Sequence, residues 1–201
     1  MLVGLGLGPG DPELLTLRAV RLLKEADAVF VPGEMARRLV APYRTAEVLE
    51  FPMTADETLI RCSIEANADR IATAAREGMV VFALLGDPNF FSTFSRLAEV
   101  LQERHPQISC TTEPGVSAIT ACCAAAGIAF SGGFIVTDGS PVTAQVLLKV
   151  RRPREAVARL RAEGYRSFVL LERIFMDEMR IHAEDAIPDE SDYFSILVAR
   201  R

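Results

Sequence analysis

The sequence predicts a two-domain α/β fold, with a mainly parallel sheet in the N-terminal domain and a mixed sheet in the C-terminal domain. Helical and strand periodicities alternate along the first half of the chain. A continuous apolar run at 80–85 is typical of a strand buried on both faces of a parallel sheet. Short β-rich segments dominate the second half. We expect domains of 1–107 and 108–201.

The N-terminal domain is predicted to begin with a strand over residues 2–7, followed by a Gly-rich turn and a helix over 13–26. One face of this helix carries apolar residues at helical spacing, namely Leu15, Ala19, Leu22, Leu23 and Ala26. A second strand is expected at 28–31, and Pro32-Gly33 ends it.

The same alternation continues through the middle of the chain. A helix over 63–77 stops at Gly78, because Gly is common just past a helix end. A strand at 79–85 and a helix over 92–104, ended by Pro106, come next. The remaining predicted elements are a strand at 108–111, an Ala-rich helix closing at Gly127, β segments at 134–137, 145–150, 167–171 and 193–199, and a helix at 153–163.

Composition and charge narrow the classes of function. The chain has 201 residues, half of them apolar, and a net charge of −5. This acidic balance argues against broad nucleic-acid or membrane-surface binding. No apolar run reaches the roughly 18 residues of a membrane span. Residues 1–5 read directly as a strand without a basic leader, so we expect a cytoplasmic protein.

The four cysteines show no metal-binding or disulfide pattern. No two of them have CxxC spacing, and neither histidine stands at metal-ligand spacing to a cysteine. Cys122 and Cys123 fall in the Ala-rich stretch and are interpreted as small core residues. We therefore expect neither a protein metal site nor a disulfide framework.

A Gly86-Asp87-Pro88 turn directly follows the buried strand at 79–85. Open α/β sheets bind ligands outside the carboxyl ends of their strands, so this turn is a candidate binding loop. Gly permits close backbone approach, and Asp87 adds an acceptor for a cation or a ribose. An ordinary strand-to-helix loop is the alternative interpretation.

The Gly-rich segment 4–12 does not match the dinucleotide-binding pattern GxGxxG. The third required glycine is replaced by Pro9 or by Asp11, depending on the starting glycine, and no P-loop Lys follows. Pro also removes an amide that would cradle a pyrophosphate. The segment is therefore predicted to allow close backbone approach without phosphate binding, or to be a simple tight turn.

Three segments together resemble the signatures of the tetrapyrrole methylases, which are S-adenosylmethionine-dependent enzymes. These are residues 6–17, Gly86-Asp87-Pro88 and residues 113–118, in the order and approximate spacing of that family. Finer features are similar to the precorrin-2 C(20)-methyltransferase branch; they lie at 51–54, 91–94, 148–150, 171–173 and 193–195. The segment between Gly127 and Leu147 is shorter than that branch leads us to expect.

The resemblance implies a cofactor cleft between two α/β domains, S-adenosylmethionine as methyl donor, and a homodimer. Carried over by position, the cofactor-binding residues would be Pro9, Leu85, Gly86, Asp87, Phe90, Ser117, Ala118, Leu148 and Ile174. Asp87 would serve the polar end of the cofactor, and Phe90 would provide an apolar contact. Ser117 also fits a helix N-cap.

The resemblance further implies methyl transfer to carbon 20 of precorrin-2 or cobalt-precorrin-2. A sister methylase acting at another ring carbon, a diphthine synthase-like protein methylase and a non-enzymatic nucleotide-binding module are the alternatives. A sulfonium is already a strong methyl donor, so positioning and water exclusion are the main tasks of the protein. No catalytic base is identified; Glu113 and Asp11 are candidates, with a structural role favoured for each.

The predicted substrate is a polycarboxylate, so cationic side chains are expected around it. The candidates are Arg18, Arg37, Arg38, Arg44, Arg151, Arg152 and Arg154. For each of them, an ordinary solvated surface charge is the alternative interpretation.

Overall fold

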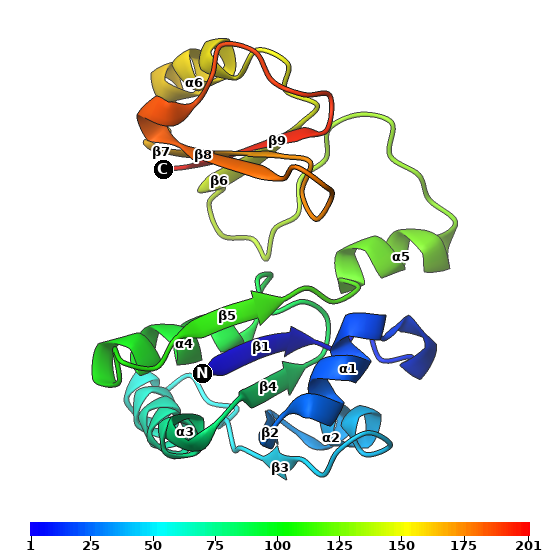
Figure 1. Ribbon diagram of the computed structural model, residues 1–201, viewed down its shortest axis with the longest axis vertical. Coiled ribbons are helices and arrows are strands. Elements are labelled where there is room, and N and C mark those ends of the chain that lie inside the picture. The colour runs from blue at the N-terminus through cyan, green and yellow to red at the C-terminus, as the bar shows by residue number, and fades with distance from the viewer. The chain divides into compact units, whose positions relative to one another are not determined.

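The computed structural model describes all 201 residues and divides into two units, Met1–Gly133 and Phe134–Arg201 (Figure 1). The first contains a parallel five-stranded sheet and the second an antiparallel four-stranded sheet, each with helices. The predicted α/β class is therefore confirmed. No helix has the length and apolar character needed to cross a membrane.

The sheet of the first unit has the strand order β3-β2-β4-β1-β5, and all neighbouring strands in it pair in parallel. Its strands are β1 (Leu2–Gly6), β2 (Ala28–Val31), β3 (Glu47–Val48), β4 (Val80–Leu84) and β5 (Cys110–Glu113). Gly6 stands opposite Leu84, and Leu5 stands opposite Glu113. The loops that follow β1, β4 and β5 consequently leave the sheet at the same edge.

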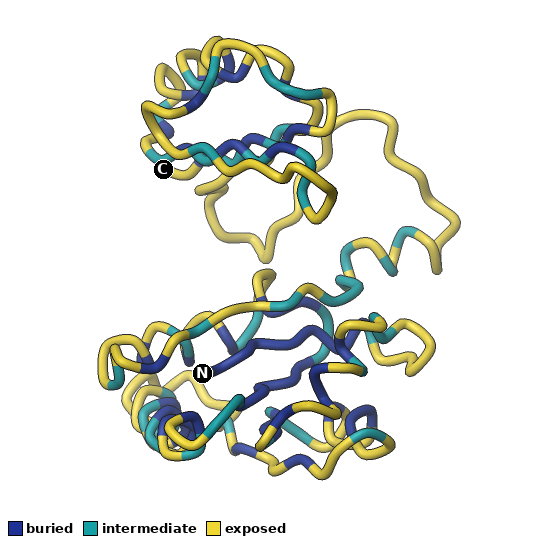
Figure 2. Tube along the Cα trace, in the orientation of Figure 1, coloured by how far each residue is buried: buried dark blue, intermediate teal, exposed yellow.

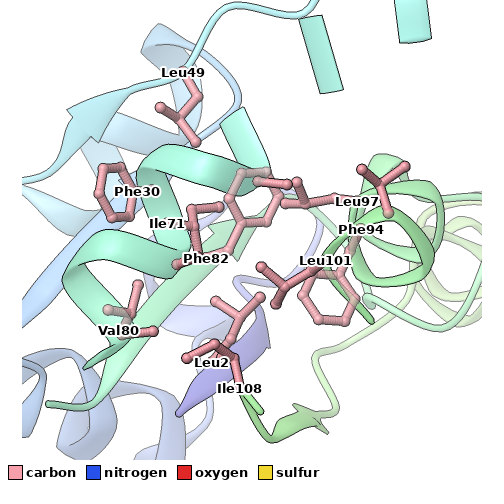
Figure 3. Close-up of a cluster of buried hydrophobic side chains, with 14 of the residues drawn as sticks. Leu2, Phe30, Leu49, Ile71, Val80, Phe82, Phe94, Leu97, Leu101 and Ile108 are labelled. Carbon is pink, nitrogen blue, oxygen red and sulfur yellow. The ribbon is translucent and has the colours of Figure 1, made fainter. Parts of the chain in front are cut away.

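Helices cover both faces of this sheet. They are α1 (Leu17–Glu25), α2 (Glu34–Val40), α3 (Glu57–Glu77) and α4 (Thr93–Arg104), with a 3-10 turn at Pro12–Leu14. Phe82 belongs to an apolar cluster with residues of α3 and α4 (Figure 3), whereas Val81 belongs to a second cluster with residues of α1 and α2. All five residues of β4 are buried, which confirms the prediction of a strand covered on both faces.

The second unit is a sheet with one helix packed on it. The strands, in the order β6-β9-β7-β8, are β6 (Ala144–Leu148), β9 (Ser195–Arg200), β7 (Ser167–Glu172) and β8 (Arg180–Ala183), and the helix is α6 (Pro153–Ala162). Phe168, Leu170 and Leu197 pack with Leu160 of α6 in one buried cluster. The sheet is antiparallel rather than mixed, because β9 lies between β6 and β7 and runs opposite to both.

The division between the units lies later than the expected boundary at 107–108. β5 pairs with β1 over Leu2–Leu5, so it belongs to the first sheet. α5 (Ala118–Ala126) follows within the same unit, which extends to Gly133. No residue of α5 is buried (Figure 2), and Cys122 is exposed, so the interpretation of this cysteine pair as core residues was wrong.

Several element boundaries differ from the predictions for local reasons. The helix expected at 13–26 begins at Leu17, because Thr16 caps it by accepting a hydrogen bond from the Ala19 amide. The helix expected at 63–77 begins at Glu57, where Asp56 accepts hydrogen bonds from two amides. The strand expected at 134–137 does not form, and α2, β3 and β8 were not predicted.

Glu172, the last residue of β7, is a buried carboxylate in the second unit. Its Oε1 accepts a hydrogen bond from the Asp192 amide at 2.8 Å, and its Oε2 lies 2.9 Å from His182 Nε2 and 3.5 Å from Arg180 Nε. Burial by itself would raise the pKa of Glu172. These partners outweigh burial, and the pKa lies below its ordinary value of 4.5.

We expect Glu172→Gln to lower the stability of the protein at pH 7 and to weaken its dependence on acid pH. A depressed folded pKa stabilises the fold above the unfolded pKa, and this contribution is lost as the pH falls through the folded pKa. The difference in stability between the wild type and the variant should therefore shrink as the pH falls below about 4.5 and close below the lowered pKa of Glu172. Thermal unfolding between pH 7 and pH 3 measures this. Glu163→Gln, which removes a surface partner of Arg159, is the control. A difference in stability between Glu172→Gln and the wild type that stays constant with pH would contradict the expectation.

Candidate functional site

Three loops converge at the carboxyl edge of the first sheet. The loops after β1 and β4 are joined by two backbone hydrogen bonds, from the Gly86 amide to the Gly8 carbonyl at 2.7 Å and from the Gly8 amide to the Gly86 carbonyl at 3.3 Å. The parallel register of β1, β4 and β5 brings these loops together, because their strands end side by side. The two Gly-containing segments found in the sequence are thus direct neighbours.

The loop after β5 approaches the other two so closely that side chains are excluded. A Cβ placed on Gly115 would lie 2.3 Å from the Gly86 carbonyl oxygen and 2.7 Å from the Gly6 carbonyl carbon. A Cβ on Gly6 would lie 2.4 Å from the Gly115 nitrogen. The close backbone approach predicted for these glycines is therefore an approach of the loops to one another.

Asp87 joins the second loop to the third. The residue is buried, and its Oδ2 accepts a hydrogen bond from the Gly115 amide at 3.1 Å. Its Oδ1 accepts from the amide of Asn89 at 2.8 Å and from the Asn89 side chain at 3.1 Å. Both carboxylate oxygens therefore accept hydrogen bonds from the protein itself, and the side chain fixes the shape of the site.

The converging loops form one wall of a pocket of about 700 Å³ in the first unit. Such a volume suits a nucleotide-sized ligand. Seven of the nine residues predicted to bind the cofactor line it: Pro9, Leu85, Gly86, Asp87, Phe90, Ser117 and Ala118. The remaining lining residues are Pro32, Gly33, Glu34, Met35, Ala36, Leu84, Phe91, Ser92, Thr93 and Ile119.

The other two predicted cofactor residues belong to the second unit. Leu148 is the last residue of β6 and is 65% exposed, and Ile174 follows β7 and is partly buried. Neither is among the residues that line the pocket. Their role in cofactor binding stays a prediction.

Sequence reasoning missed the part of the pocket wall formed by residues 32–36. This segment follows β2 at the edge where the other loops leave the sheet, and it begins α2. Pro32-Gly33 was recognised only as the end of a strand. Its position after a parallel strand was the signal that could have identified it, because binding loops cluster at that edge.

Ser117 has both of the roles considered for it. Its hydroxyl accepts a hydrogen bond from the Ile119 amide at 3.2 Å, so it is the N-cap of α5. It also lines the pocket, and the first turn of α5 is therefore part of the wall. The N-terminus of a helix presents polarised amides to its surroundings, which favours polar or anionic ligand groups there.

All seven candidate cations already have contacts within the protein. Arg18 Nη1 lies 3.0 Å from Glu113, and Arg37 donates two hydrogen bonds to Glu34, which lowers the pKa of that carboxyl. Arg38 also lies 3.6 Å from Glu34. The other assigned contacts are Arg44 with the Asp27 carbonyl, Arg152 with Glu155, Arg154 with Asp189, and Arg151 over the Tyr193 ring.

The two candidate bases both have structural roles. Glu113 pairs with Arg18, and Asp11 caps the 3-10 turn through the Glu13 amide. No histidine, cysteine, lysine or arginine lines the pocket, and its two carboxylates, Glu34 and Asp87, are bonded to protein groups. Apart from these two carboxylates, the pocket is built from backbone, apolar and hydroxyl groups, which can hold and orient an already reactive ligand.

Comparison with known proteins gives a match over nearly the whole chain. Residues 1–191 match the family model described as Tetrapyrrole (Corrin/Porphyrin) Methylases. A probable cobalt-precorrin-2 C(20)-methyltransferase of Methanocaldococcus jannaschii is 33% identical over 134 residues, which are 62% of this chain and 56% of that relative. The aligned part thus spans little more than half of the relative.

Two further similarities extend along the full chain. A precorrin-2 C(20)-methyltransferase of Sinorhizobium is 29% identical over 232 aligned positions, covering 98% of this chain and 94% of that relative. The crystal structure of the methyltransferase CobJ superposes with a TM-score of 0.53 at 22% identity, covering 100% of this chain and 93% of that one. This structural similarity supports the assignment of the fold.

Proposed function

Because the chain belongs to the tetrapyrrole (corrin/porphyrin) methylases, we propose that it methylates carbon 20 of precorrin-2 or cobalt-precorrin-2 in cobalamin biosynthesis. It is an S-adenosylmethionine-dependent C-methyltransferase, as its family is. The observation that carries the proposal is the convergence of the three signature loops on one pocket, lined by seven of the expected cofactor residues. The two C(20)-methyltransferase relatives support the choice of ring carbon.

The residues present fit this methyl donor. The pocket has the volume of a nucleotide site, and loop backbone and small side chains form much of its wall. When bound, S-adenosylmethionine supplies a methyl group that needs no further activation. The task of the protein is then to hold donor and acceptor in line and to exclude water.

We assign separate roles to the residues of the wall. Asp87 keeps the Gly115 loop in place, and Phe90 contributes an apolar contact to the cofactor. Ser117 and Ala118 present the first turn of α5. The substrate carbon lies in an electron-rich, enamine-like system that can itself attack the methyl group, after which one proton is lost. The structural roles of Glu113 and Asp11 argue against either as the proton acceptor.

We expect the purified protein to add one methyl group to precorrin-2. The test incubates it with enzymatically prepared precorrin-2, with and without cobalt, and S-adenosylmethionine. A mass gain of one methyl group, located at carbon 20 by NMR, is the expected result; the two arms also show whether cobalt precedes methylation. A reaction without S-adenosylmethionine is the control. A methyl group at another carbon would place the chain in a sister branch, and no transfer would reject the proposal.

The cellular location and the oligomeric state belong to the same proposal. We propose a cytoplasmic homodimer, in keeping with a biosynthetic enzyme of this family. Light scattering of the purified protein measures the oligomeric state directly, and a monomer at micromolar concentration would contradict it.

A further inference from the structure

Phe91 has a backbone conformation that is unfavourable for its side chain. Its φ is +48°, in the left-handed region, where a bulky residue is rare. Such a conformation persists only where the surroundings enforce it, and residues of this kind cluster at functional sites. The reason for keeping an aromatic residue at this position must therefore be sought outside local backbone preference.

Hydrogen bonds on either side hold the turn in this shape. Asn89 donates from its backbone and its side chain to Asp87, and the Ser92 hydroxyl donates to the Pro88 carbonyl. α4 begins immediately afterwards, at Thr93. The backbone of Phe91 is thus fixed between a tied turn and a helix start.

The side chain of Phe91 contributes little to the core. It is 65% exposed and belongs to neither apolar cluster of the first unit. It lines the 700 Å³ pocket together with two other exposed apolar residues, Phe90 at 54% and Met35 at 68%. Exposed apolar side chains gathered at a pocket are typical of a ligand-binding surface.

The charges of the pocket indicate which part of a ligand this surface contacts. No lysine or arginine lines it, so it offers no ion pair to a carboxylate. A polycarboxylate macrocycle that lies beside the cofactor, against these exposed apolar side chains, would therefore meet them with the flat face of its ring, with its acidic arms directed elsewhere. An aromatic side chain favours offset stacking on such a conjugated ring.

We infer that Phe91, together with Met35, forms an apolar platform on which one face of the tetrapyrrole macrocycle stacks during methyl transfer. This inference rests on the proposed function and adds a substrate-binding role for a residue outside the expected cofactor set. Phe91 retains its strained backbone because the platform needs an aromatic ring at this point of the turn. Phe90, the neighbouring ring, keeps its proposed contact with the cofactor.

The experiment compares Phe91→Ala, Phe91→Gly and Phe91→Tyr. The first two remove the ring, so the KM for precorrin-2 should rise at least about tenfold, which corresponds to roughly 1.4 kcal/mol. Phe91→Tyr should retain the wild-type KM. The Kd for S-adenosylhomocysteine, measured by calorimetry, should stay within about twofold of wild type in all three. Leu59→Ala, which removes another exposed apolar side chain, from α3 and outside the pocket lining, is the control.

Thermal unfolding tests the strain separately. Phe91→Gly should unfold about 2–4 °C above Phe91→Ala, because only Gly adopts a positive φ without cost. Equal unfolding temperatures would overturn the strain argument, and an unchanged KM in Phe91→Ala would overturn the platform. Failure of the wild type to methylate precorrin-2 would instead reject the proposed function, and with it the substrate named here.

Discussion

Gly115→Ala is expected to destabilise the first unit and to abolish tight binding of S-adenosylhomocysteine. The added Cβ would lie 2.3 Å from the Gly86 carbonyl oxygen and 2.7 Å from the Gly6 carbonyl carbon. Both are backbone atoms, so no side-chain rotation relieves the clash. Overpacking of this kind costs about 1–3 kcal/mol, and the three loops must separate to accommodate it.

Cofactor affinity should fall together with stability, because the displaced loops form part of the pocket wall. We expect the Kd of S-adenosylhomocysteine to rise at least about tenfold by calorimetry, equivalent to roughly 1.4 kcal/mol. Gly132→Ala is the matched control, since a Cβ at that position meets nothing within 4 Å. Normal cofactor affinity in Gly115→Ala would show that the contact between these loops does not shape the site.

The strands β2 and β4 were the most predictable part of the fold. Their residues are apolar without interruption, and β2 forms at the predicted residues 28–31. The helix predicted over 63–77 also forms, as the larger part of α3, and Ile64, Ala68 and Ile71 on one of its faces are buried. Local pattern was sufficient here because burial dictates where the apolar residues of these elements stand.

The elements that were missed depend on contacts distant in sequence. β3 has only two residues and exists through its pairing with Phe30 and Val31. β8 is an edge strand of only four residues, most of them exposed, and it is too short for its alternation to mark it as a strand. The assignment of β5 to the first sheet is likewise decided by its pairing with β1, which no local pattern in 108–113 reveals.

The position of the candidate site was predicted from its loops. The chemistry of the site was predicted from the types of residue in those loops. Gly86 and Asp87 were recognised because they follow a buried strand. The sequence could not reveal that Asp87 accepts a hydrogen bond from Gly115, because the two residues are 28 positions apart. It also gave no sign of the strained backbone at Phe91, since a positive φ at a bulky residue has no sequence signal.

Asp87→Ala is expected to weaken cofactor binding strongly by releasing the loop after β5. The change leaves the amides of Gly115 and Asn89 without their acceptor, and a hydrogen bond to a charged group contributes about 1.5–3 kcal/mol. We expect the Kd of S-adenosylhomocysteine to rise about 10–100-fold by calorimetry, equivalent to roughly 1.4–2.8 kcal/mol. Loss of the loop position, rather than of a direct cofactor contact, is the cause.

Asp87→Asn tests the hydrogen bonds of Asp87 themselves, because the variant keeps the shape of the side chain and one carbonyl oxygen. That oxygen can accept from Asn89 or from Gly115 but not from both, since the other atom is now a donor. Affinity should therefore fall in Asp87→Asn as well, while Arg37→Ala, which removes only the surface pair with Glu34, should leave it within about twofold. Equal losses in Asp87→Ala and Arg37→Ala would contradict this placement of the site. Full affinity in Asp87→Asn would show that one acceptor at this position is enough, and the paired hydrogen bonds from Asn89 and Gly115 would then not both be needed to hold the loop after β5.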